Sequence, residues 1–170
     1  MKIEIRQETP KDFDQIYNLV KMAFQTAKVS NGQEQDFVNQ LRHSDNYIPE
    51  LALVAECDRQ LVGHIMLTRN YINPGRKKNQ TLLLAPISVM LEYRNRGIGT
   101  QLIRSSFKQA KNMGYRSVVL VGDPAYYHRF GFKKAADFGI THMQDIPEEY
   151  VLACELVPNG LDGVRGAIDC

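Results

Sequence analysis

The chain has 170 residues, of which 44% are hydrophobic and 24% charged, and its formal net charge at pH 7 is +2. This length suits a domain with its own core, and the composition is that of globular proteins, which argues against a disordered or membrane-embedded chain. The net charge is too small to indicate a polyanion, so neither nucleic acid nor a membrane is an expected partner. We therefore expect a single domain over residues 1–170.

The cysteines and the first residues bear on the compartment. The three cysteines, at positions 57, 154 and 170, form an odd set without the paired spacing of a zinc site or a disulfide framework. This usage predicts a reduced, cytoplasmic location and no metal site. The opening residues, MKIEIRQE, alternate apolar and charged side chains, whereas a signal peptide needs an unbroken apolar stretch.

The first predicted elements are a strand and two helices. Residues 2–8 alternate as in a half-buried strand. A helix follows, with Thr9 as N-cap, Pro10 at the first helical position and Asp12 at the third. A shorter helical pattern covers residues 33–43.

Two strand-like runs come next. Residues 51–57 and 61–72 are apolar runs joined by the three residues Asp58–Gln60, which predicts an antiparallel hairpin. The polar segment 73–80 carries the basic run Arg76-Lys77-Lys78, which is interpreted as a solvated turn.

The middle of the chain predicts a strand, helix and strand in succession. Residues 81–90 are dense in apolar side chains, as in a strand covered on both faces. The helical pattern of 97–113 ends at Gly114, and 117–123 form another buried strand. Such a unit is expected to be parallel and right-handed.

Less pattern remains in the last third of the chain. Residues 124–130 suit a short helix, and 131–135 a turn into an edge strand. Residues 150–157 predict a last strand, and the Gly- and Asp-containing tail 158–170 a loop. If 150–157 lay at the edge of the sheet, it could pair with a second copy of the chain, so a homodimer is one candidate assembly.

The segment RNRGIG, residues 94–99, opens a predicted helix directly after a buried strand. The first amides of a helix have no intrahelical partner, and its aligned peptide dipoles leave about half a positive charge there, so an anion fits well. Gly97 and Gly99 allow a close approach to the backbone, and Arg94 and Arg96 add positive charge. The segment therefore predicts a phosphate or pyrophosphate site.

The segment departs from two familiar phosphate-binding motifs. A dinucleotide fingerprint requires a third glycine where the chain has Leu102, and a Walker loop requires Lys and Ser or Thr where it has Thr100-Gln101. An unrelated nucleotide-phosphate binder would use the helix terminus without either motif. The plainest alternative is a glycine-bearing turn that only packs a helix on a strand.

Two spaced motifs resemble the GNAT N-acetyltransferases. Arg94-x-x-Gly97-x-Gly99 matches the (Arg/Gln)-x-x-Gly-x-(Gly/Ala) pyrophosphate loop of that family, within the strand-loop-helix segment LAPISVMLEYRNRGIGTQLI. The second block, VVLVGDPAYYHRFGFKKA, is similar to the family's fifth strand and the Tyr-x-x-x-Gly-Phe segment after it. The GDPAYY block and ELVPNGLDGV together resemble the YhbS-like bacterial branch. The resemblance covers nearly the whole chain.

This resemblance implies an α/β (α+β) fold with a mixed, mostly antiparallel sheet flanked by helices. The fourth and fifth strands would be parallel and splay apart, with acetyl-CoA in the gap as co-substrate and no metal. The backbone of one strand segment would pair with the pantetheine arm, and that of the following loop would hold the pyrophosphate. The implied cofactor-binding residues are Ile87, Ser88, Val89, Arg94, Asn95, Arg96, Gly97, Ile98, Gly99 and Thr100.

By the same resemblance, Tyr127 stands where the family places a tyrosine that donates a hydrogen bond or a proton to the departing thiolate. A tyrosine that only packs is the alternative. Many members carry a glutamate on the fourth strand as general base, but this strand offers Ser88 and no carboxylate, so water or a remote group is expected to serve. Four other polar candidates are interpreted as structural: Glu34, His43, His64 and His142. Asp123 lies nearer the expected chemistry, and a turn cap before Pro124 explains it equally well.

The implied function is an N-acetyltransferase that moves the acetyl group of acetyl-CoA to a primary amine by direct attack within a ternary complex. No cysteine falls in either motif, which favours direct attack over a covalent intermediate on the enzyme. A small-molecule or peptide amine is the expected acceptor. The alternative from another class is a non-catalytic acyl-CoA sensor or regulatory module, which the missing strand-four carboxylate favours.

Overall fold

The computed structural model describes residues 1–73 and 78–170, so most of the turn expected around Arg76-Lys77-Lys78 lies outside the described residues. The strands are β1 (Glu4–Gln7), β2 (Ala52–Cys57), β3 (Gln60–Ile72), β4 (Asn79–Val89), β5 (Ser117–Val121), β6 (Lys133–Lys134), β7 (Ile140–His142), β8 (Val151–Glu155) and β9 (Gly166–Ile168), and the helices are α1 (Phe13–Phe24), α2 (Glu34–Arg42), α3 (Ile98–Asn112) and α4 (Pro124–Tyr127). Within this described part, no helix is long and apolar enough to cross a membrane.

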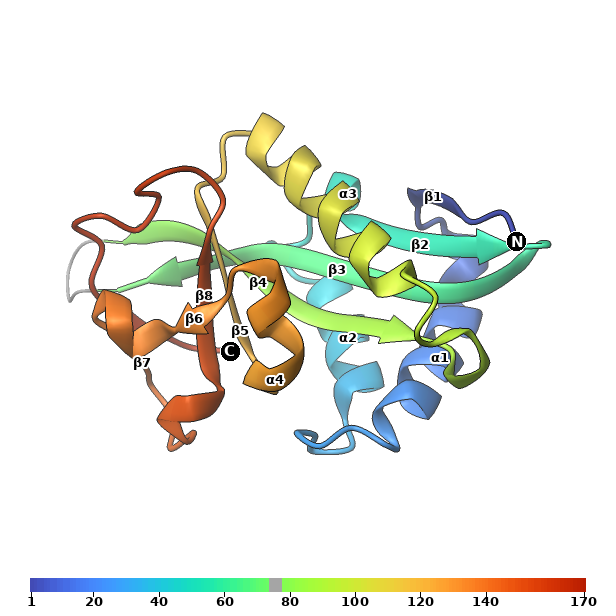
Figure 1. The fold of residues 1–170 in the computed structure, drawn as a ribbon, viewed down its shortest axis with the longest axis horizontal. Coiled ribbons are helices and arrows are strands. Elements are labelled where there is room, and N and C mark those ends of the chain that lie inside the picture. Colours follow the sequence, from blue (N-terminus) through green and yellow to red (C-terminus); the bar gives the residue numbers. More distant parts are fainter. Residues whose placement is uncertain (74–77) are drawn as a thin grey trace. The chain divides into compact units, whose positions relative to one another are not determined.

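The strands form one large mixed sheet and one small sheet (Figure 1). The large sheet has seven strands in the order β1-β2-β3-β4-β5-β8-β6, and the small one pairs β7 with β9. Strands β1, β2 and β3 pair antiparallel in succession, as β8 does with both β5 and β6. Strand β4 pairs with β5 in parallel. The predicted mixed, mostly antiparallel sheet with a parallel fourth and fifth strand is confirmed.

The chain divides into two compact units. The first unit consists of Met1–Thr68 and Ala85–Ala110, and the second of Arg69–Leu84 and Lys111–Cys170. The chain passes from one unit to the other inside β3, β4 and α3 rather than in linkers.

In the first unit, helices α1 and α2 bury their apolar stripes against strands β2 and β3. The core residues of this cluster are Ile16, Val20, Val38, Ala52, Val54, Leu61 and Met66. Helix α3 packs at Gly63 of β3, because a Cβ built on Gly63 would lie 2.9 Å from Leu102 Cδ1 and 3.1 Å from Ile98 Cγ2. This glycine therefore allows the first turns of α3 to lie close on the strand.

In the second unit, the core gathers around β5, β8 and the small sheet. Its buried residues are Ile72, Val119, Ala135, Ile140, Val151, Ala153, Leu161 and Ile168. Gly160 is required by packing, since a Cβ there would lie 2.3 Å from the carbonyl oxygen of Arg116. That carbonyl accepts the Leu156 N–H at 2.9 Å, which holds the segment after β8 beside the start of β5.

Three expectations from the sequence are corrected. Strand β8 is not an edge strand, because β5 and β6 flank it, and the edge is the two-lysine strand β6. The route to a homodimer through residues 150–157 is therefore withdrawn. The tail 158–170 is not all loop, since it contains β9, which pairs in parallel with β7. The sequence did not predict β7 either. The β2–β3 connection has two residues, Asp58 and Arg59, both with positive φ.

Candidate functional site

The start of α3 presents a row of unpaired backbone amides. The first hydrogen bond of this 15-residue helix runs from the Gln101 N–H to the Gly97 carbonyl, at 3.0 Å. Within the described ranges, no protein group accepts a hydrogen bond from the amides of residues 95–100. Unpaired amides at a helix N-terminus are donors for an anion, and the helix dipole favours negative charge there.

The backbone before α3 turns sharply. Asn95 and Gly97 lie between the 3₁₀ turn Leu91–Tyr93 and the helix and have positive φ values, 64° and 79°. Such alternation of left- and right-handed residues is typical of backbone turns whose amides bind anions. An added Cβ on Gly97 would meet nothing within 4 Å, so the space beside this residue is open. The glycine at 97 is thus explained by its φ and by an open approach to the backbone rather than by packing.

The guanidinium of Arg94 does not extend freely from the loop. It donates to the carbonyl of Ala23 at 2.9 Å, to Thr26 Oγ1 at 3.1 Å and to the carbonyl of Val89 at 3.4 Å. Arg94 therefore fastens the loop to the end of α1 and to the end of β4. Its charge remains near the unpaired amides, but its hydrogen bonds serve the protein's own carbonyls, which the sequence did not indicate.

The side chain of Arg96 takes a different course. Its guanidinium lies over the ring of Tyr93, with the central carbon 5.2 Å from the ring centroid. It is exposed, and its Nη1 also lies 3.5 Å from Met1 Sδ. Both arginines of this loop are exposed, but the Arg94 guanidinium is held by backbone carbonyls, whereas that of Arg96 lies over a ring.

The final residues of β4 have no strand partner on the β5 side among the described residues. The parallel pairing with β5 joins Leu82 to Val118 and Leu83 to Val119 and stops there, while β4 continues to Val89. Ile87 and Val89 are half-buried, and Ser88 between them is buried with a hydroxyl that has no hydrogen-bond partner in the structure. The stretch 87–89 thus offers an unpaired strand edge directly before the loop.

Tyr127 ends helix α4 in the second unit and is held among aromatic rings. Its ring packs edge-on against Tyr126, with centroids 5.0 Å apart, and against Phe132 at 5.7 Å. Burial raises the pKa of the Tyr127 hydroxyl well above its ordinary value, and the neighbouring Tyr126 and Asp123 add to the effect. The hydroxyl therefore keeps its proton at neutral pH, and no described residue hydrogen-bonds to it.

A buried charged cluster that the sequence did not predict lies in the first unit. The Glu8 carboxylate accepts from Arg42 at 2.7 and 3.0 Å, from His64 Nε2 at 2.9 Å and from Tyr47 at 2.7 Å. The Glu8 and His64 side chains have no exposed area, and that of Arg42 is 4% exposed. Burial opposes ionisation of Glu8, but hydrogen bonds from His64, Arg42 and Tyr47 outweigh it and lower the pKa of Glu8 to about 2.

The polar residues that were interpreted as structural have structural contacts. The Asp123 carboxylate accepts the Ala125 N–H at 3.0 Å and caps α4. Glu34 accepts from Ser30 and the Asn31 amide before α2. His43 lies 2.7 Å from the carbonyl of Asn39, and His142 accepts the Gln144 N–H at 2.9 Å.

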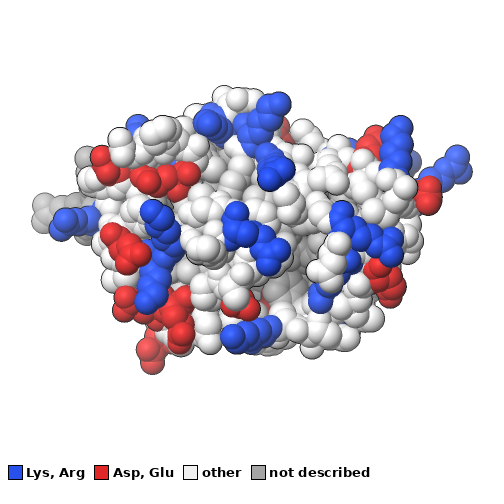
Figure 2. Space-filling model, viewed as in Figure 1, with Lys and Arg blue, Asp and Glu red and all other residues white. Residues whose placement is uncertain are grey.

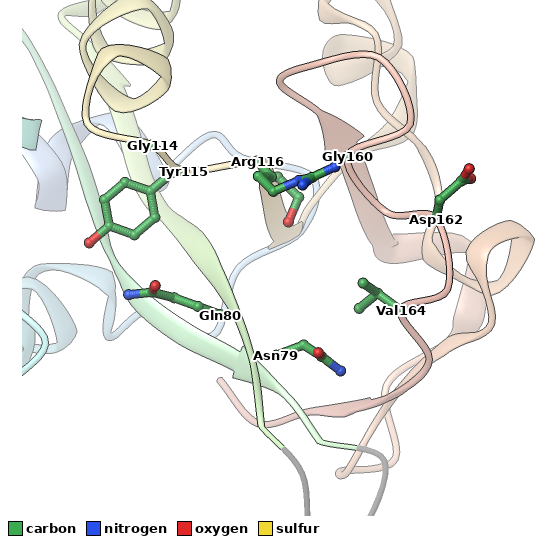
Figure 3. Close-up of a pocket in the computed structure, with 9 residues that line it drawn as sticks. Asn79, Gln80, Gly114, Tyr115, Arg116, Gly160, Asp162 and Val164 are labelled. Atoms are coloured by element: carbon green, nitrogen blue, oxygen red, sulfur yellow. The ribbon is translucent and has the colours of Figure 1, made fainter.

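The second unit contains a polar cavity of about 300 Å³ (Figure 3). It lies at the start of β4 and β5, where Asn79, Gln80, Tyr115, Arg116 and Asp162 belong to its lining. None of the residues predicted to bind a cofactor or to act in catalysis lines it. Figure 3 shows Arg116 and Gly160 next to each other in this lining.

Surface charge and potential metal ligands do not indicate a further binding site among the described residues. On the face drawn in Figure 2, Lys and Arg side chains are interspersed with Asp and Glu rather than gathered into one basic field. Among residues 1–73 and 78–170, no group of three or more His, Cys, Asp or Glu side chains is placed to hold a metal ion. The unpaired amides before α3, the strand edge 87–89 and Tyr127 are the features with chemistry to explain.

Comparisons with known sequences agree with the two motifs. The profile of the acetyltransferase (GNAT) domain matches residues 4–135. The uncharacterized N-acetyltransferase YhbS of Escherichia coli (strain K12) is 30% identical over 97% of this chain and 94% of its own length. The uncharacterized N-acetyltransferase YjhQ of the same organism is 34% identical over 69% of this chain and 66% of its own length.

Solved structures extend the likeness to the whole fold. A structure of the GNAT family N-acetyltransferase YhbS from Escherichia coli in complex with CoA has 28% identity and a TM-score of 0.88, covering 99% of this chain and 89% of that one. A GNAT family acetyltransferase from Brucella melitensis in complex with acetyl-CoA has 32% identity and a TM-score of 0.78, covering 98% and 94%. This chain belongs to the GNAT family of acetyltransferases, with YhbS as a homologue along nearly its whole length.

Proposed function

We propose that residues 1–170 act as one catalytic domain that transfers the acetyl group of acetyl-CoA directly to a primary amine in a ternary complex. The observation that carries this proposal is the row of unpaired amides at residues 95–100, at the N-terminus of a 15-residue helix. Six donors with no protein partner, beside an open glycine and the Arg96 guanidinium, suit a diphosphate better than a single carboxylate.

Acetyl-CoA is the proposed ligand because the unpaired edge of β4 continues directly into this loop. A pantetheine arm carries amide groups and can pair with Ile87, Ser88 and Val89 as an added strand would. The family relatives from Escherichia coli and Brucella melitensis were solved with CoA and acetyl-CoA respectively, which supports the same ligand class here. The backbone from Arg94 to Thr100 would then hold the diphosphate.

The amine must lose a proton before it attacks the thioester. An amine with a pKa near 10.4 is neutral in about one part per thousand at pH 7.4, equivalent to roughly 4 kcal/mol, so the site must favour the free amine. No residue of β4 (Asn79–Val89) is a carboxylate, and water is the proposed proton acceptor. A backbone N–H near Val89 would stabilise the oxyanion that forms at the carbonyl.

Tyr127 is the proposed donor to the departing thiolate. Its raised pKa keeps the phenol protonated at neutral pH, so it can donate. The same raised pKa makes full transfer to a thiol of pKa about 8.5 more unfavourable than the reference values suggest. Tyr127 is therefore proposed to stabilise the thiolate by a hydrogen bond while it keeps its own proton, and the CoA thiolate takes up a proton from solvent afterwards.

Direct attack is favoured over an acetyl-cysteine intermediate because the chain's thiols are poor nucleophiles. Burial raises the pKa of Cys154 to about 11, with a contribution from Glu155, and the pKa of Cys170 to about 11, with one from Asp169. Cys57 is buried. Thiols with a pKa as high as those of Cys154 and Cys170 stay protonated and react slowly at neutral pH.

Release of free CoA thiol across a panel of amines, including small amines and peptide N-termini, tests the proposed activity. Acetyl-CoA hydrolysis without amine serves as the blank. Amine-dependent thiol release with acetylated product in the mass spectrum supports transfer. The second candidate, a non-catalytic acyl-CoA sensor, is favoured by the absence of a carboxylate on β4. Binding of acetyl-CoA by calorimetry with no thiol release across the panel would establish it instead.

Tyr127→Phe is expected to lower kcat by roughly tenfold or more while the affinity for acetyl-CoA changes less than about twofold. A hydrogen bond to a developing charge contributes about 1.5–3 kcal/mol, and removing it affects the transition state rather than the bound cofactor. Turnover is measured by thiol release and affinity by calorimetry. Tyr126→Phe, which removes a neighbouring hydroxyl on the same helix, is the control. Unaltered turnover in Tyr127→Phe assigns the residue to packing.

A further inference from the structure

Gly122 continues the sheet one residue beyond β5. Its N–H donates to the carbonyl of Tyr150 at 2.9 Å, in register with the pairing of Val121 and Val151. Its φ lies outside the left-handed region, unlike the positive φ of seven other glycines of the described chain. Alanine could adopt this backbone without strain, and such a substitution would reduce the conformational entropy of the unfolded chain.

The reason for a glycine at this position lies in one side chain. A Cβ built on Gly122 would stand 2.7 Å from Cε2 and 3.3 Å from Cδ2 of Tyr127, and 3.1 Å from Cδ1 of Leu120. A separation of 2.7 Å is well inside van der Waals contact for two carbon atoms. The ring of Tyr127 therefore rests on the bare α-carbon of Gly122.

The backbone that carries the ring is held in place by hydrogen bonds. Asp123 caps the turn through the Ala125 N–H, and the Tyr127 N–H donates to the Asp123 carbonyl at 3.3 Å. Tyr126 packs against the ring at an interplanar angle of 90° and Phe132 at 68°. A methyl group on residue 122 would thus displace the ring and its hydroxyl rather than be absorbed by the backbone of α4.

We propose that Gly122 is a positioning residue for the transfer reaction: its missing side chain sets where the Tyr127 hydroxyl stands. This inference rests on the proposed role of Tyr127 as donor to the departing thiolate. The proposed role of Gly122 is independent of the anion-binding loop, because residues 122–127 belong to the second unit and the loop belongs to the first. Cofactor affinity and turnover should therefore separate.

Gly122→Ala is expected to lower kcat at least about tenfold and to leave the KM for acetyl-CoA within about twofold. The tenfold loss corresponds to an activation free energy that is higher by about 1.4 kcal/mol. In the double variant Gly122→Ala/Tyr127→Phe, kcat should equal that of Tyr127→Phe alone, because the displaced hydroxyl is already absent. A double variant whose two losses multiply would overturn the proposal, as would a Gly122→Ala enzyme with the wild-type kcat.

A spectroscopic readout follows the tyrosine without catalysis. With ring-¹³C-labelled tyrosine, the Tyr127 signal is identified by its loss in Tyr127→Phe. It should keep the chemical shift of a protonated phenol above the pH at which an ordinary tyrosine titrates, near 10. In Gly122→Ala the signal should move at pH 8, because the ring is displaced from its position against residue 122. An unchanged signal contradicts the proposal.

Leu120 is the competing neighbour of the added methyl, and a second variant separates the two. Leu120→Val removes the Cδ atoms that the methyl would approach. If Leu120 takes up the strain, Leu120→Val/Gly122→Ala regains the kcat of Leu120→Val, and the proposal fails. If Tyr127 takes it up, the loss persists, as we expect.

A stability measurement covers the case in which Gly122→Ala folds poorly. Tyr127→Leu shortens the side chain that the methyl meets. The substitution Gly122→Ala should lower the denaturation midpoint in the Tyr127 protein and not in the Tyr127→Leu protein. Equal losses in both backgrounds overturn the proposal. If Tyr127→Phe leaves turnover unchanged, the proposed donor role of Tyr127 is wrong. If Tyr127→Phe is impaired but Gly122→Ala has the wild-type kcat, only the positioning role of Gly122 is wrong.

Discussion

Gly99→Asp is expected to weaken acetyl-CoA binding by about a hundredfold or more, which corresponds to about 2.7 kcal/mol. Gly99 is the buried second residue of α3, and its amide is one of those without a protein partner. Two unit charges of like sign 4 Å apart repel by about 4 kcal/mol at an effective dielectric constant of 20. A carboxylate in the first turn would also accept hydrogen bonds from the amides that we assign to the diphosphate.

The measurement is titration calorimetry with acetyl-CoA, with circular dichroism to verify the fold. Gln109→Asp is the matched control, because it adds the same charge to the same helix ten residues later, about 15 Å along the axis. This distance exceeds the Debye length of about 8 Å at physiological ionic strength, so the control should bind nearly as the wild type does. Undiminished affinity in a folded Gly99→Asp protein would remove the start of α3 from the proposed site. Equal losses in both variants would point to net charge instead.

Glu8→Ala is expected to destabilise the fold by about 3–5 kcal/mol, the range found when one partner of a buried ion pair is removed. The variant leaves the Arg42 guanidinium, 4% exposed, without its carboxylate, and it also removes the acceptor of His64 and Tyr47. Since small domains are stable by about 5–15 kcal/mol, this loss is a large part of the total. Urea denaturation followed by circular dichroism gives the free energy of unfolding.

Glu56→Ala provides the comparison for this variant. Glu56 accepts from Arg6 at 3.0 Å, but both side chains are partly exposed, at 25% and 31%. Water solvates the remaining arginine there, so a cost below about 1 kcal/mol is expected. Similar costs in the two variants would show that burial of the Glu8 cluster does not govern its contribution. An exchange of both partners, Glu8→Leu with Arg42→Met, should recover much of the loss.

The pH dependence of stability should report the same carboxylate. Because the pKa of Glu8 falls from 4.5 to about 2 in the folded chain, its contribution of ~3 kcal/mol is complete above pH 4.5 and is lost as the pH falls toward 2. The pKa of Asp12, lowered to about 2 chiefly by its hydrogen bond from Arg6, acts in the same direction. In Glu8→Gln, the decline between pH 4.5 and 2 should be shallower. Parallel curves for the two proteins would contradict this assignment.

Local patterns predicted the elements that repeat over many residues. Three of these patterns are the amphipathic stripe of α3, the alternation of β1 and the continuous apolar run of β4. All three elements are present. The hairpin Asp58–Arg59 was predicted one residue too long because positive φ at two non-glycine residues has no clear sequence signal.

Features that depend on distant partners were not predictable from the same patterns. Strands β7 and β9 have three residues each, too few to show an alternation, and they exist because they pair with one another. The buried cluster joins residues that are far apart in the sequence: Arg42 lies 34 positions after Glu8, and His64 lies 56 positions after it. No local pattern therefore marks them as a cluster. The motif RNRGIG predicted the turn and the start of the helix correctly. It did not predict that Arg94 binds the carbonyl of Ala23 in α1, because the two residues are 71 positions apart.

The order of strands in the large sheet constrains how the chain is completed during synthesis. Strand β8 fills the position between β5 and β6 although it is made after both. A nascent chain that has emerged only as far as residue 140 can pair β5 with β4 but not with β8, and β6 still lacks the strand that it pairs with. Completion of this half of the sheet must await emergence of residues 151–155, and until then β5 lacks the partner strand on that side.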